Sequence, residues 1–192
     1  MKGLRGSRRA VAGLACALVL TGCSTFEGTG DKGYVSGDGR VTQVAAVDRG
    51  EPIVLEGEDL EGQPLDLADY RGKPVVVNVW GSWCAACRIE TPDLLEAEEE
   101  LEGVAEFVGI NSRDTSTAQA LSYERRAGIT FPSFYSPTGE AALAFPQLAI
   151  ATVPATIVLD AEGRVAATIP GGLPSAQTLV DVVEDAAGST DG

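Results

Sequence analysis

Two of the four cysteines, Cys84 and Cys87, stand three positions apart, directly after a run of apolar residues. The run spans 74–80 and is rich in β-branched residues, which predicts a strand buried on both faces. We expect a helix to begin at Cys84, where unpaired backbone N–H groups and the helix dipole favour an anion. This position lowers the pKa of the Cys84 thiol and makes it the attacking thiolate, while the less exposed Cys87 resolves the mixed disulfide.

A Cys-x-x-Cys pair is a weak signal by itself, because half of a zinc site has the same spacing. This sequence has no histidine and no second such pair with which to complete a tetrahedral site. A purely structural disulfide is the other alternative, but so short a loop would stabilise the fold little. A buried strand followed by a helix favours redox chemistry over both alternatives, with the disulfide as the only redox group and no metal.

The elements that would position the pair alternate along the chain. We expect a hairpin with arms at 53–55 and 65–67, and a helix over 84–101 in which Pro92 causes a kink or a restart. Further strands are predicted at 106–110, 131–135, 156–159 and 165–169, and further helices at 118–126, 140–145 and 177–187. This order predicts an α/β fold with a central mixed sheet flanked by helices.

The first 22 residues have the features of a secretion signal. Four basic residues precede a short apolar run over 10–22, which is too short to span a bilayer comfortably. The run ends in Leu-Thr-Gly-Cys, which resembles a bacterial lipoprotein box. Cleavage before Cys23 and attachment of lipid to its sulfur would anchor the protein at the extracytoplasmic face of the cell membrane. An ordinary signal peptide that happens to meet a cysteine is the alternative.

Composition divides the rest of the chain. Residues 23–50 are rich in glycine and poor in large apolar side chains, which predicts a flexible tether, with a short hairpin between 34–35 and 41–44. The globular domain is expected over 51–188, with a disordered tail at 189–192. The chain has 28 acidic and 14 basic residues, so nucleic-acid phosphates should repel it and no nucleic-acid partner is expected.

The segment from Asn78 to Pro92 resembles the active site of the TlpA/ResA family of thioredoxin-like proteins, which are membrane-tethered extracytoplasmic disulfide reductases. The resemblance extends over about 51–187. The stretch 65–73 is similar to the family's lead-in to its first core strand, and 118–135 is similar to its central helix–strand insert. The resemblance implies a protein disulfide as substrate, with apocytochrome c among the candidates, and a membrane thiol reductase as electron donor. We expect the protein to act as a monomer.

The same resemblance implies roles for four further residues. Thr152 to Thr156 resembles the family's cis-proline loop, in which a cis Val153–Pro154 bond would leave the backbone of Val153 free to pair with an extended substrate across from Cys84. A plain turn proline at Pro154 is the alternative. Glu90, one helical turn after Cys87, would handle the proton of that thiol, unless it is simply a surface carboxylate. Trp83 would belong to an apolar docking rim or to the core.

One departure and two rival functions bear on the expected activity. Ala85 and Ala86 separate the cysteines where the family often has a proline, and they offer the thiolate no hydrogen bond, which favours a reducing protein with a potential of about −250 mV. A peroxiredoxin-like thiol peroxidase would need a threonine and an arginine beside its cysteine, and 80–83 is Trp-Gly-Ser-Trp. A metal chaperone or other non-enzymatic binding lipoprotein would want a histidine that the chain lacks.

Overall fold

The computed structural model describes residues 41–146, 148 and 152–188, and it has a six-stranded mixed sheet at its centre. The strand order is β1-β8-β7-β4-β5-β6. The strands are β1 Thr42–Gln43, β4 Val75–Trp80, β5 Glu106–Ser112, β6 Ser133–Ser136, β7 Ala155–Leu159 and β8 Val165–Pro170. Strands β4, β5 and β6 run parallel, whereas β7 is antiparallel to both β4 and β8, and β1 is antiparallel to β8. The mixed sheet predicted from the sequence is confirmed.

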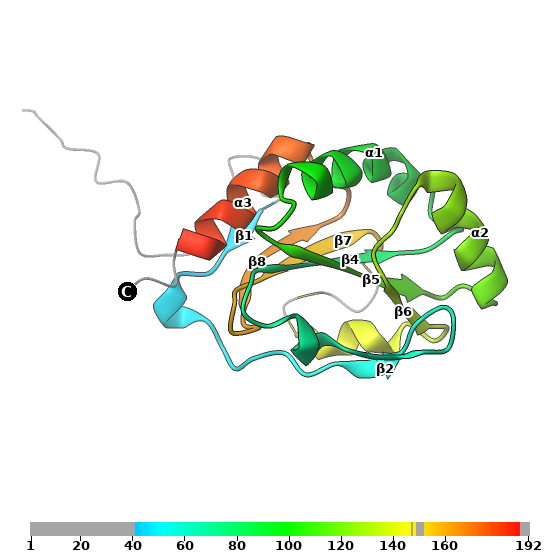
Figure 1. The fold of residues 1–192 in the computed structure, drawn as a ribbon, viewed down its shortest axis with the longest axis horizontal. Coiled ribbons are helices and arrows are strands. Elements are labelled where there is room, and N and C mark those ends of the chain that lie inside the picture. The colour runs from blue at the N-terminus through cyan, green and yellow to red at the C-terminus, as the bar shows by residue number, and fades with distance from the viewer. Residues whose placement is uncertain (1–40, 147, 149–151, 189–192) are drawn as a thin grey trace, which may run out of the picture.

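Helices cover one face of the sheet, and a small hairpin with a short 3-10 helix covers the other (Figure 1). The helices are α1 Ala85–Glu100, α2 Thr117–Ala127 and α3 Ala176–Gly188. The opposite layer consists of the hairpin β2 Glu56–Glu58 with β3 Pro64–Asp66, and of η3 Glu140–Ala144; shorter 3-10 turns lie at η1 Ala46–Asp48 and η2 Leu67–Tyr70. Because both faces are covered, all six residues of β4 are buried, as its nearly continuous apolar run predicted.

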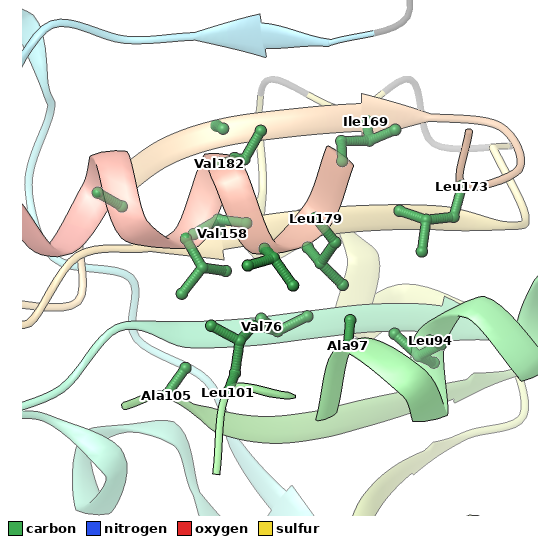
Figure 2. Packing of buried hydrophobic residues seen from close by; sticks show 14 of the residues in the cluster. Val76, Leu94, Ala97, Leu101, Ala105, Val158, Ile169, Leu173, Leu179 and Val182 are labelled. Carbon is green, nitrogen blue, oxygen red and sulfur yellow. The ribbon is translucent and has the colours of Figure 1, made fainter. Parts of the chain in front are cut away.

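The core between the helices and the sheet fixes the position of α1. In Figure 2, side chains of α1 and α3 gather around Val76 of β4 and Val158 of β7. Leu94 and Ala97 of α1 are 1% and 0% exposed, so this face of the helix packs on the sheet. The predicted restart at Pro92 is wrong, because α1 continues unbroken to Glu100. Pro92 is itself exposed, and the burial of its neighbours offsets the cost of about 3 kcal/mol for a proline inside a helix.

The packed domain begins earlier than the sequence predicted. Residues 41–50, which we assigned to the tether, lie against the domain: Val41 is buried in the core, and β1 pairs with β8. Arg49 forms a buried ion pair with Asp160, with 3.1 Å between Nη1 and Oδ2. Composition misses this because a two-residue strand needs only a sheet edge to pair with, not a run of large apolar residues.

Several other expectations about the termini fall outside the described residues. These include the leader, the anchor at Cys23, the Tyr34–Val35 arm of the proposed hairpin and the tail at 189–192; the other arm, 41–44, contributes β1, whose partner is β8. In the described part of the chain, no helix is both long and apolar enough to cross a bilayer.

Candidate active site

Cys84 and Cys87 form a disulfide at the N-terminus of α1, at the end of the buried strand β4. Cys84 is the N-cap residue, and its Sγ accepts a hydrogen bond of 3.0 Å from the backbone N–H of Cys87. This N–H group, together with the positive end of the helix dipole, would stabilise a thiolate at Cys84. The exposed fractions are 4% for Cys84 and 1% for Cys87, so the expected difference in exposure is small in this oxidised form.

A buried carboxylate holds the residues that lead into the pair. Asp114, which follows β5 and is 2% exposed, accepts hydrogen bonds from the backbone N–H of Ser82 (2.9 Å), from Ser82 Oγ (2.5 Å) and from Asn111 Nδ2 (2.6 Å). All three partners act as donors, which is the arrangement that an ionised carboxylate requires. No cation pairs with Asp114 among the described residues. The Asp114 carboxyl group is therefore fixed against Ser82, which lies two residues before Cys84.

Trp83 is held by the same loop. Its indole Nε1 donates to the carbonyl of Ser112 (3.0 Å), and the guanidinium of Arg113 lies 4.9 Å from the ring centroid, within the range of a cation–π interaction. Arg113 adopts a φ of 61°, a left-handed conformation that is costly for a residue with a Cβ. Gly81 is required here, since a Cβ at that position would lie 2.5 Å from the Trp83 Nε1. The ring is 48% exposed, so Trp83 belongs to the surface beside the disulfide and not to the core.

Glu90 lies inside the protein, on the turn of α1 that follows Cys87. Its Oε1 accepts from Asn78 Nδ2 (3.0 Å) and its Oε2 accepts from the backbone N–H of Leu173 (2.8 Å). Asn78 also donates to Thr156 Oγ1 (3.2 Å), which links β4, β7 and α1. Glu90 is 3% exposed, so the surface-carboxylate alternative is wrong.

Burial raises the pKa of Glu90 above its ordinary value of 4.5. The two hydrogen bonds, from Asn78 and Leu173, oppose this shift by stabilising the charged form, and the neighbouring carboxylate of Asp93 adds to it. A buried carboxyl group with a raised pKa, one helical turn from Cys87, is suited to exchange a proton with the thiol of that residue.

A second set of contacts fixes the backbone of Cys87. Thr91 Oγ1 donates to the carbonyl of Cys87 (2.7 Å) and shares a hydrogen bond of 2.6 Å with the hydroxyl of Tyr123 on α2. The Tyr123 ring lies 5.1 Å from that of Trp80, whose Nε1 donates to Ser133 Oγ (3.2 Å). Trp80 is 1% exposed, so it belongs to the core that supports the pair.

The loop before β7 closes the site from the other side. The peptide bond between Val153 and Pro154 is cis, and the Pro154 carbonyl accepts a hydrogen bond of 3.0 Å from the backbone N–H of Gly171. Val153 packs against the cluster that contains Cys84 and Cys87. The structure thus brings Trp83, Glu90 and the Val153–Pro154 loop around the disulfide.

Two residues of this environment were not identified from the sequence: Asp114 and Tyr123. Each lies at least 27 positions from both cysteines in the chain, and each is a common residue type without a local motif. Pairing of β4 with β5 brings Asp114 to the active-site turn, and the contact of α2 with α1 brings Tyr123 there, so no local signal could have indicated them.

Comparisons with known proteins agree with this geometry. A family model described as Redoxin matches residues 40–184. The thiol-disulfide oxidoreductase ResA of Geobacillus thermodenitrificans is 32% identical over 132 residues, which are 68% of this chain and 72% of that protein. The crystal structure of a DsbF homologue from Corynebacterium diphtheriae has 36% sequence identity and a TM-score of 0.72, and the match covers 80% of this chain and 98% of that one. A secreted thiol-disulfide isomerase from Corynebacterium glutamicum matches with 28% identity and a TM-score of 0.73, over 81% and 96% of the two chains.

Proposed function

This chain belongs to the Redoxin family and is a thiol–disulfide oxidoreductase of the ResA-like, thioredoxin-fold type, and from that premise we propose that it works as a membrane-tethered disulfide reductase outside the cytoplasm. The observation that carries the proposal is the Cys84–Cys87 disulfide at the N-terminus of α1, beside the buried carboxyl group of Glu90. A structural disulfide would need neither the helix N-terminus nor an acid with a raised pKa one turn away.

In the proposed reaction the reduced protein gives two electrons to a substrate disulfide. The Cys84 thiolate attacks one substrate sulfur, a mixed disulfide forms, and the other substrate sulfur leaves as a thiolate that takes up a proton. Glu90 accepts the proton of Cys87, whose thiolate then attacks Cys84 Sγ. The bond between Cys84 and the substrate breaks, the second substrate sulfur leaves as a thiolate that takes up a proton, and the protein is left with the Cys84–Cys87 disulfide seen in the structure.

The substrate would bind as an extended strand beside the Val153–Pro154 loop. Val153 packs against the cluster of the two cysteines, which places the loop next to the reacting sulfurs. Backbone groups of an ordered loop can pair with an added strand, and this mode of binding does not depend on the side chains of the substrate. Secreted or membrane proteins, apocytochrome c among them, are the proposed substrates.

The proposed membrane tether is based on the leader and Cys23, and the proposed direction of electron transfer is based on the surroundings of the two cysteines. A membrane anchor suits a reductant that must be recharged by a membrane thiol reductase, since the compartment itself favours disulfides. The thiolate of Cys84 has the helix N-terminus to stabilise it, while Ala85 and Ala86 add no donor and the nearby carboxylate of Asp114 opposes it. A less stable thiolate makes the disulfide harder to reduce, so we expect a potential of about −250 mV.

Equilibration of the soluble domain with dithiothreitol or glutathione buffers tests the direction, and reduction of insulin tests the activity. A potential near that of thioredoxin, with catalysed insulin reduction that is lost in Cys84→Ser, would support the proposal. A potential above about −150 mV would instead assign the protein as an oxidant of thiols.

A further inference from the structure

A groove between α1 and α2 reaches the active-site turn, since Ser82 and Arg88 are among the residues that line it, and the proposed function does not use it. Its larger part has a volume of about 650 Å³ and is continuous with a second hollow of about 420 Å³ through Arg88 and Arg126, which line both. Pro92 and Leu95 of α1 and Ala127 of α2 give it an apolar floor. Pockets of this size accommodate one or two side chains of a bound peptide.

The two arginines of the groove lack acidic partners. Among the described residues Arg88 donates to the backbone carbonyl of Ser82 and Arg126 donates to Ser122 Oγ, and neither makes an ion pair. No aspartate or glutamate lines either hollow. The chain as a whole is acidic, with 28 acidic residues against 14 basic ones. Because this groove has two exposed guanidinium groups and no carboxylate, it is a locally positive site.

We propose that this groove binds the acidic flank of the substrate polypeptide. An apolar side chain of the flank lies on the floor of the groove, and one or two of its carboxylates bind Arg88 and Arg126. The inference rests on the proposed reductase function and names the class of substrate that it prefers. Arginine is suited to this task because its planar guanidinium binds a carboxylate through two hydrogen bonds. An electroneutral or basic partner would leave both guanidiniums without a counter-charge.

The dimensions of α1 fix where the acidic residues should lie in the substrate. Leu95 is 11 residues beyond Cys84, which corresponds to about 16 Å along the helix at 1.5 Å per residue. An extended chain covers this distance in about five residues. The groove should therefore recognise carboxylates within about two to five positions of the substrate cysteine.

The test compares kcat/KM for peptides that share one disulfide and a neighbouring leucine but carry two aspartates, two asparagines or two lysines at the flanking positions. For the wild-type protein, kcat/KM should be about fivefold higher for the aspartate peptide than for the asparagine peptide. This ratio corresponds to about 1 kcal/mol of ion-pair energy. This preference should shrink in 0.5 M NaCl. Arg126→Glu should abolish it and should favour the lysine peptide.

Arg125→Glu is the matched control, because it makes the same charge change on an exposed residue of α2 that does not line the groove. The preference for the aspartate peptide should persist in this variant. An equal loss in both variants, or equal rates for all peptides, would overturn the groove assignment. Binding to anionic phospholipid vesicles that depends on Arg126, without any peptide preference, would overturn it in favour of a lipid surface. Failure of the wild type to reduce any peptide would overturn the proposed reductase function as well.

Discussion

Replacing Glu90 by glutamine should remove a pH-dependent loss of stability from the oxidised protein. Glu90 is 3% exposed, and its burial raises the pKa of the carboxyl group above 4.5. Between 4.5 and the raised value, the unfolded chain has released this proton and the folded chain still holds it. The free energy of unfolding therefore falls as the pH rises through this window, by up to about 1.4 kcal/mol per pH unit for one group.

The pH dependence of stability separates the loss of the titrating carboxyl group from the loss of hydrogen bonds in the same substitution. Glutamine can accept from Asn78 or from the Leu173 N–H with its carbonyl, but its NH₂ group must face the other donor. The mismatch should cost about 1–3 kcal/mol at every pH. It shifts the whole stability curve, whereas loss of the titrating group changes the slope of the curve.

Urea denaturation of the disulfide form, monitored by tryptophan fluorescence between pH 4 and pH 8, measures both the shift of the stability curve and the change in its slope. The stability of Glu90→Gln relative to the wild type should rise with pH through the window above 4.5. Glu96→Gln, an exposed residue of the same helix, is the control and should follow the wild-type curve. Parallel curves for Glu90→Gln and the wild type would refute the conclusion that burial raises the pKa of Glu90 in the folded protein.

Three further predictions concern the cysteines and the loop that supports them. Iodoacetamide should label Cys84 of the reduced protein before Cys87, because the helix N-terminus stabilises the Cys84 thiolate; mass spectrometry that finds Cys87 labelled first would reverse the roles. Asp114→Asn should destabilise the domain by about 1–3 kcal/mol, because the NH₂ group of the new amide faces donors from Ser82 and Asn111. The substitution should also lower the pH midpoint of Cys84 labelling, because it removes a nearby negative charge. An unchanged midpoint would show that this charge does not affect the thiol. Cys23→Ala should release the protein from membranes in cell fractionation, and a variant that stays membrane-bound with its leader uncleaved would show a different anchor.

The redox pair and most of the elements around it could be predicted from the sequence. The Cys84–Cys87 spacing, the apolar run of β4 and the helical pattern after it are local features, and each is decided within about 20 residues of chain. The helix over 118–126 and the strands at 156–159 and 165–169 were predicted for the same reason, because glycine in the left-handed region after the helix and a tight turn between the strands act locally. Most boundaries shifted by up to two residues, since pairing partners set where a strand ends. The first arm of the predicted hairpin is wrong, because the strand β2 lies at Glu56–Glu58 and not at 53–55.

The surroundings of the pair, in contrast, depend on how distant segments of the chain pack together. Position in the first turns of a helix is compatible with an exposed or a buried Glu90, and the choice depends on whether β7 and the loop before α3 cover it. The same holds for Asp114, which meets Ser82 because β5 lies parallel to β4, and for the groove, which exists because α2 lies across from α1. Burial, hydrogen-bond partners and pKa shifts are properties of segments that are distant in the chain and adjacent in space, so the physical forces that set them act only after the fold has formed.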